Sequence, residues 1–181
     1  MIAFAVALLL VPPATIQVAG ASSPQASEAV SLQADFLKDW EAQKNKLMKI
    51  AAAMPDDKFG FKPKPELRTW AEQLTHIAGN IIGTMRRLDA SVTPPTPPEK
   101  ADTKADVLKV LGDAFDFGIA VLKKQTDATI VQSVQGPTYY GPGLSTRARL
   151  IYRTMVHSED EYGVMTVYLR LNGITPPASE R

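Results

Sequence analysis

Residues 69–85, TWAEQLTHIAGNIIGTM, carry the pattern that decides the fold. Large apolar side chains recur in this stretch every three or four residues, which is the spacing of one helix face packed against a core. Thr69 and Glu72 have the spacing of a capping box, in which two side chains satisfy free backbone N–H groups at a helix start. The stretch therefore predicts an amphipathic helix, and it contains His76, one of only 2 histidines in the chain.

Three further windows repeat this helical spacing, and clusters of proline separate them. Because an interior proline removes a helical hydrogen bond and clashes with the preceding turn, helices fit best in the proline-free windows. Apolar positions follow three-to-four spacing in residues 36–54, 108–122 and 151–169, and Asn172-Gly173 is a typical helix stop after the last window. The sequence predicts an all-α fold, namely a four-helix bundle with Pro-rich loops that are long enough for a crossover connection.

The remaining segments offer weaker signals. Thr103 with Asp106 imitates a capping box at the start of the third helix. Residues 129–134 have β character, but they stand alone, and we expect a short extended link there and no sheet. The run YYGPG at residues 139–143 is typical of a turn leading into the fourth helix, and the alternative is that it lines the mouth of a pocket.

Composition limits the classes of function. The 181 residues include 20 Lys+Arg, 19 Asp+Glu, 2 His and no Cys, which fits one globular domain. A net charge of +1, without a cluster of basic and aromatic residues, argues against nucleic acid as a partner. The lack of cysteine excludes disulfides, thiolate metal ligands and cysteine nucleophiles. Any chemistry must therefore use histidines, carboxylates or hydroxyls.

The first 27 residues contain no charged side chain and begin with an apolar run from Ile2 to Val11 that is too short to span a bilayer. Small residues at 19–21 suit a signal peptidase, so we expect an exported bacterial protein, periplasmic or secreted, with no membrane contact beyond its signal. A retained helical anchor is the alternative, which prolines 12 and 13 would kink. The expected organisation is a signal peptide over 1–21, a flexible linker over 22–30, the helical bundle over 31–177 and a tail over 178–181.

The candidate chemistry lies on the second and fourth predicted helices. Glu161 follows His157 by four residues, which places the imidazole and the carboxylate on one face of the fourth helix, in an otherwise apolar stripe. A carboxylate directed at a core is unfavourable unless something compensates its charge. A divalent cation held by His157, Glu161 and a histidine of a facing helix would do so. The alternative is a solvated acidic face beside a hydrogen-bonded histidine, which suits Glu159 and Asp160.

At these residues the chain resembles the DinB-like superfamily of metal-binding four-helix bundles, the fold also used by the bacillithiol and mycothiol S-transferases. The segments that carry the resemblance are MPDDKFGFKP at 54–63, RTWAEQLTH at 68–76, HSEDEYG at 157–163 and YLRLNGITPP at 168–177. The resemblance covers most of the chain after the signal peptide. It implies a divalent metal held by one histidine of the second helix and a His-x-x-x-His pair of a later helix.

The resemblance places His76 and His157 at the two first ligand positions, while Glu161 stands where the family has a third histidine. A carboxylate there lowers the charge of the site by one and favours harder metals, so Zn²⁺, Ni²⁺ and Fe²⁺ are all candidates. The implied function is that of a metal-dependent transferase or hydrolase acting on an unknown small molecule. Thiol transfer is the less favoured version for an exported protein. The alternative is a non-catalytic metal-binding or protein-interaction bundle, and the family also implies a homodimer.

Overall fold

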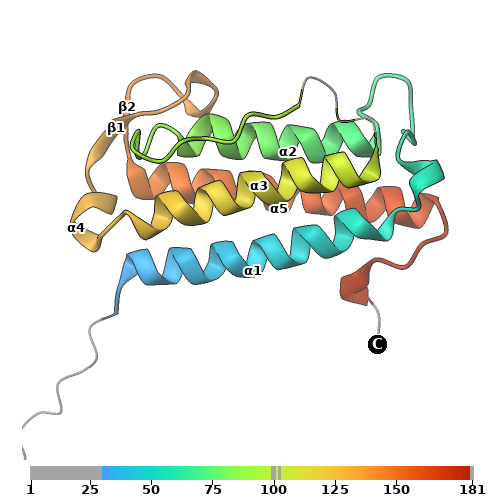
Figure 1. Cartoon of the computed structure of the whole chain (residues 1–181), viewed down its shortest axis with the longest axis horizontal. Coiled ribbons are helices and arrows are strands. Elements are labelled where there is room, and N and C mark those ends of the chain that lie inside the picture. The colour runs from blue at the N-terminus through green and yellow to red at the C-terminus, as the bar shows by residue number, and fades with distance from the viewer. Residues whose placement is uncertain (1–29, 99–100, 102, 180–181) are drawn as a thin grey trace, which may run out of the picture. The chain divides into compact units, whose positions relative to one another are not determined.

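A computed structural model describes residues 30–98, 101 and 103–179, so the predicted signal peptide and nearly all of the linker lie outside the described residues. The predicted all-α bundle is confirmed. Its long helices are α1 (Leu32–Ala53), α2 (Trp70–Met85), α3 (Lys104–Lys123) and α5 (Arg147–Leu171) (Figure 1). The short elements are η1 (Asp56–Lys58), α4 (Asp127–Ile130), β1 (Ser133–Gln135), η2 (Thr138–Tyr140), β2 (Leu144–Thr146) and η3 (Pro177–Ser179). Among the described helices, none is both long and apolar enough to cross a membrane.

The helices form a ring in which α1 and α2 each pack against α3 and α5. Lys104 at the start of α3 donates to the Met54 carbonyl after α1, and Arg147 at the start of α5 donates to the Leu88 carbonyl after α2, so both pairs are antiparallel. Figure 1 shows that α2 and α3 run in the same direction. The chain after α2, described for residues 86–98, therefore returns along the bundle before α3 begins, which is the crossover connection that the sequence predicts.

Both predicted capping boxes are present. At α2 the Thr69 hydroxyl accepts from the Glu72 N–H at 3.1 Å, and the Glu72 carboxylate accepts from the Thr69 N–H at 2.6 Å. The hydrogen bonds from Thr69 also lower the pKa of Glu72. Thr103 and Asp106 make the same reciprocal contacts at the start of α3. These local signals fix where α2 and α3 begin.

The expectation of an isolated extended link at residues 129–134 was wrong. Part of that stretch belongs to the helical turn α4, and β1 pairs antiparallel with β2, Val134 lying opposite Ser145. The connection between the strands turns through Gly141 and Gly143, whose φ angles of 107° and 91° favour glycine. The pairing was missed because β2 itself, Leu-Ser-Thr, has no strand pattern in the sequence.

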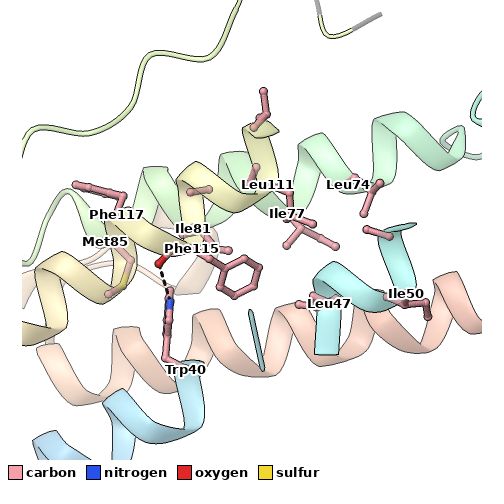
Figure 2. Close-up of a cluster of buried hydrophobic side chains, with 14 of the residues drawn as sticks. Trp40, Leu47, Ile50, Leu74, Ile77, Ile81, Met85, Leu111, Phe115 and Phe117 are labelled. Atoms are coloured by element: carbon pink, nitrogen blue, oxygen red, sulfur yellow. Dashed lines mark hydrogen bonds between the residues drawn. The ribbon is translucent and has the colours of Figure 1, made fainter. Parts of the chain in front are cut away.

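A close contact between α1 and α3 organises the core (Figure 2). Trp40 of α1 is fully buried, and its indole N–H donates to the Phe115 carbonyl of α3 at 3.2 Å. The indole covers Gly118 so closely that a Cβ atom added there would lie 2.3 Å from the Trp40 ring. Gly118 is therefore required for the two helices to approach each other at this point.

Gly118→Ala is expected to lower the free energy of unfolding by about 1–3 kcal/mol, because the new methyl group overpacks the core against Trp40. Gly112→Ala is the matched control in the same helix, since its Cβ would lie 3.8 Å from the Met48 methyl group, an ordinary contact. It should be neutral or stabilise by about 0.5–1 kcal/mol through helix propensity. Urea unfolding followed by circular dichroism measures both, and equal effects would contradict the proposed close packing.

Candidate metal centre

Two hydrogen bonds at opposite ends fix how α2 lies along α5. Near the start of α2, the Tyr168 hydroxyl donates to the Arg68 carbonyl at 3.0 Å. Beyond the end of α2, Arg147 donates to the Leu88 carbonyl at 2.8 Å. The two histidines lie between these contacts, one on each helix.

The three residues predicted as metal ligands come together at this seam. The Nε2 atoms of His76 and His157 lie 3.1 Å apart, and their rings are nearly perpendicular, at 85°. Oε1 of Glu161 lies 3.4 Å from Nε2 of His76 and 3.8 Å from Nε2 of His157. One ligand atom of each residue therefore points to a common centre, and we call these residues the His-His-Glu cluster.

The size of the His-His-Glu cluster fits a divalent metal ion. A point equidistant from three atoms separated by 3.1, 3.4 and 3.8 Å lies about 2.0 Å from each of them, close to Zn–N and Zn–O bond lengths. Two imidazoles and one carboxylate are also a donor set that suits zinc and non-haem iron. On both grounds the cluster could hold a metal ion.

Burial favours the metal-binding form of one member of the cluster, His76. Only 12% of the Glu161 side chain is exposed, compared with 32% for His76 and 24% for His157. Burial, together with the charges of Arg68 and His157, lowers the pKa of His76, so its neutral form persists to lower pH. The neutral imidazole is the form that binds a metal. Burial and the Glu161 charge raise the pKa of the Tyr168 hydroxyl beside the cluster.

The alternative of a solvated acidic face applies to the neighbours of Glu161 and not to Glu161 itself. Glu159 and Asp160 are exposed, as expected. Glu159 pairs with Lys46 of α1 and accepts a hydrogen bond from Gln43 at 2.9 Å. Glu161 points the other way, into the seam between α2 and α5, where the described residues offer it the two imidazoles.

A pocket of about 700 Å³ adjoins the two histidines and extends toward the hairpin formed by β1, β2 and the connection between them. Tyr139 and Tyr140 form part of its wall, so the YYGPG run turns the chain toward α5, as expected, and also lines a pocket, which was the alternative. The Tyr139 hydroxyl lies 3.0 Å from that of Thr84, and the Tyr140 hydroxyl donates to Asn80 at 3.0 Å. These contacts anchor the hairpin connection on α2.

Four polar residues of this pocket were not predicted from the sequence, and two of them are the arginines at the end of α2. Asn80 lies one helical turn after His76, and Arg153 lies one turn before His157. The same i, i+4 spacing that paired His157 with Glu161 would have placed both residues on the faces that carry the histidines. Nothing in the sequence alone, however, shows that the tyrosines close a cavity over them.

The fold and the cluster together define a helical bundle with a candidate metal site in one helix seam, and comparison with known proteins gives its family. The DinB family model matches residues 27–180, so the chain belongs to the DinB family. No curated protein sequence matches it.

Two solved structures share this fold. A DinB-like protein from Bacillus cereus is 14% identical with a TM-score of 0.66, over 81% of this chain and 96% of that one. A DinB-like protein from Bacillus subtilis is 17% identical with a TM-score of 0.63, over 78% of this chain and 93% of that one. At these identities the likeness shows the fold alone.

Variants of Glu161 test the ligand set. Glu161→Ala should remove most of the bound metal, because it deletes the only carboxylate of the cluster, whereas Glu161→His should retain metal by supplying a third imidazole. Asp160→Ala is the matched control, since Asp160 is exposed on the adjacent position. Metal content of the untagged proteins is measured by mass spectrometry after loading with Zn²⁺. Equal metal content in Glu161→Ala and Asp160→Ala would exclude Glu161 as a ligand.

Proposed function

We propose that the chain is a divalent-metal-dependent enzyme that acts on a small molecule by group transfer or hydrolysis. His76, His157 and Glu161 would hold the ion, with Zn²⁺, Ni²⁺ and Fe²⁺ as candidates. The observation that carries the proposal is the convergence of three ligand atoms, 3.1 to 3.8 Å apart, at the edge of a pocket.

The number of ligands supports a catalytic site over a structural one. Structural zinc sites are closed by four protein ligands, whereas catalytic sites use three and leave a position for water or substrate. The cluster offers three, and both of its histidines also line the pocket. When bound, a divalent ion supplies Lewis-acid chemistry to a group placed beside it.

The roles of the chain's own residues follow from this arrangement. Glu161 as a ligand is not free to act as a base, and its charge offsets part of the charge of the ion. The described lining of the pocket contains no carboxylate. Proton transfer would therefore fall to the substrate or to solvent. Asn80 and Tyr140, which are joined by a hydrogen bond of 3.0 Å, would orient the substrate from the wall of the pocket.

The proposal includes export to the periplasm or the medium, which is supported by the uncharged residues 1–27 and their apolar run. Outside the cytoplasm, thiol transfer is the less favoured reaction, so we place hydrolysis and other group transfers first. Pairing of two bundles into a homodimer also stays a prediction, supported by family resemblance.

Cobalt substitution tests whether the site has an open position. The untagged protein loaded with Co²⁺ should show visible absorption bands that shift when azide is added, because azide would occupy a coordination position that the protein leaves free. His157→Ala should lose these bands, and Asp160→Ala should keep them. Bands that do not respond to azide would contradict a catalytic site and favour a non-catalytic metal-binding bundle. Failure to bind Zn²⁺, Ni²⁺, Fe²⁺ or Co²⁺ would leave a protein-interaction bundle with a degenerate site.

A further inference from the structure

The pocket beside the His-His-Glu cluster carries a concentration of positive charge. Arg86 and Arg87 contribute to its lining from the end of α2, and Arg153 contributes from α5. No aspartate or glutamate is part of the described lining. The pocket is therefore basic, although the whole chain has a net charge of only +1.

These arginine charges are not neutralised by the protein in the described part of the chain. Among the described residues, no arginine forms an ion pair with a carboxylate. The basic partners are lysines, as in Lys44 with Asp116 and Lys104 with Asp56, or the two histidines beside Glu161. A guanidinium group presents N–H donors in a planar fork that matches a carboxylate or a phosphate. Unpaired guanidinium groups around a cavity therefore favour an anionic ligand.

Arg153 is the member of this group that lies away from a helix end. Arg86 and Arg87 lie at the C-terminus of α2, where positive charge stabilises the helix dipole, and Arg87 donates to the Gly83 carbonyl at 3.2 Å. Arg153 lies inside α5, away from both ends. Its guanidinium group stands over the ring of Tyr140, 5.2 Å from the centroid.

Tyr140, which lies beneath Arg153, is held in place by burial and by two hydrogen bonds. Tyr140 is 9% exposed, its hydroxyl donates to Asn80 at 3.0 Å, and its carbonyl accepts from Arg149 at 3.1 Å. The Tyr139 ring packs edge-on against that of Tyr140, with centroids 4.7 Å apart, and is itself exposed. The wall thus presents an exposed cation above a buried tyrosine and next to the exposed ring of Tyr139.

We propose that this pocket binds a small organic anion, with its carboxylate or phosphate group on Arg153 and its apolar part against Tyr139. Arg153 precedes His157 by one helical turn, which is about 6 Å along the axis. An anion held there reaches the His-His-Glu cluster with its other end. Only this last point rests on the proposed function, since the anion site itself needs no metal.

Calorimetric titration of the full untagged protein, metal-free and zinc-loaded, tests the proposal with three probes. Benzoate and phenyl phosphate carry the two candidate acidic groups, and benzamide is the uncharged analogue of benzoate. At least one anion should bind and benzamide should not, and the tighter anion identifies the acidic group. Arg153→Gln should weaken anion binding about 10-fold or more in the metal-free protein, the effect of losing hydrogen bonds between charged groups. Arg170→Gln, on an exposed position of the same helix, should leave it unchanged.

The outcomes separate the two proposals. Equal anion affinity in Arg153→Gln and Arg170→Gln, equal binding of benzamide and benzoate, or no anion binding in either form would overturn the anion site. Failure of the protein to bind zinc, nickel, iron or cobalt would overturn the proposed metal enzyme, while the metal-free titrations would still decide the role of Arg153. The thermal unfolding midpoint of each variant shows whether the variant is folded, so that a loss of binding is not mistaken for a loss of structure.

Discussion

The register between α2 and α5 is the constraint on which the candidate site depends. A shift of one residue along a helix moves a side chain by about 1.5 Å and turns it by about 100°, enough to separate His76 from His157. Hydrogen bonds from Tyr168 and from Arg147 hold the seam at its two ends. The Tyr168 end is reinforced by ring contacts, since Tyr168 packs edge-on against Phe61 and lies beside Trp70. The His-His-Glu cluster is thus positioned by contacts that contain none of its three residues.

The contacts of Glu161 explain why the His-His-Glu cluster could hold a cation. A proton on one of the two imidazoles can form a hydrogen bond between the Nε2 atoms of His76 and His157, which lie 3.1 Å apart. That proton cannot also form a hydrogen bond with Glu161. Glu161 remains 3.4 and 3.8 Å from the imidazoles, longer than a charge-assisted hydrogen bond of about 2.7–2.9 Å. A buried carboxylate with such loose partners is unfavourable. A single divalent ion would satisfy all three groups together, which is why the proposed function begins from this cluster.

Much of the fold followed from local chemistry in the sequence. Helical spacing and the capping boxes at Thr69 and Thr103 predicted where α2 and α3 begin. The histidine in α2, and the spacing of Glu161 one helical turn after His157, predicted which three residues come together in the cluster. The hairpin and the pocket wall were not accessible in this way. Tyr139 meets α2 across 55 residues of chain, and such a contact depends on how the elements pack, which local spacing does not encode.

The cluster and the pocket wall are built from different kinds of structure, and this separates metal binding from ligand choice. The cluster lies on α2 and α5, where neither partner can move without disturbing the core. Part of the pocket wall comes from Tyr139 and Tyr140, in the connection between β1 and β2, whose path turns through glycines. The Tyr140 hydroxyl donates to Asn80 of α2, and the Tyr140 ring lies beneath the Arg153 guanidinium group. Connections tolerate change more readily than packed helices, and function resides in sites that a fold supports. A change in this connection would alter which anion fits and leave the ligand geometry intact, so specificity in the proposed enzyme belongs to the hairpin and Arg153.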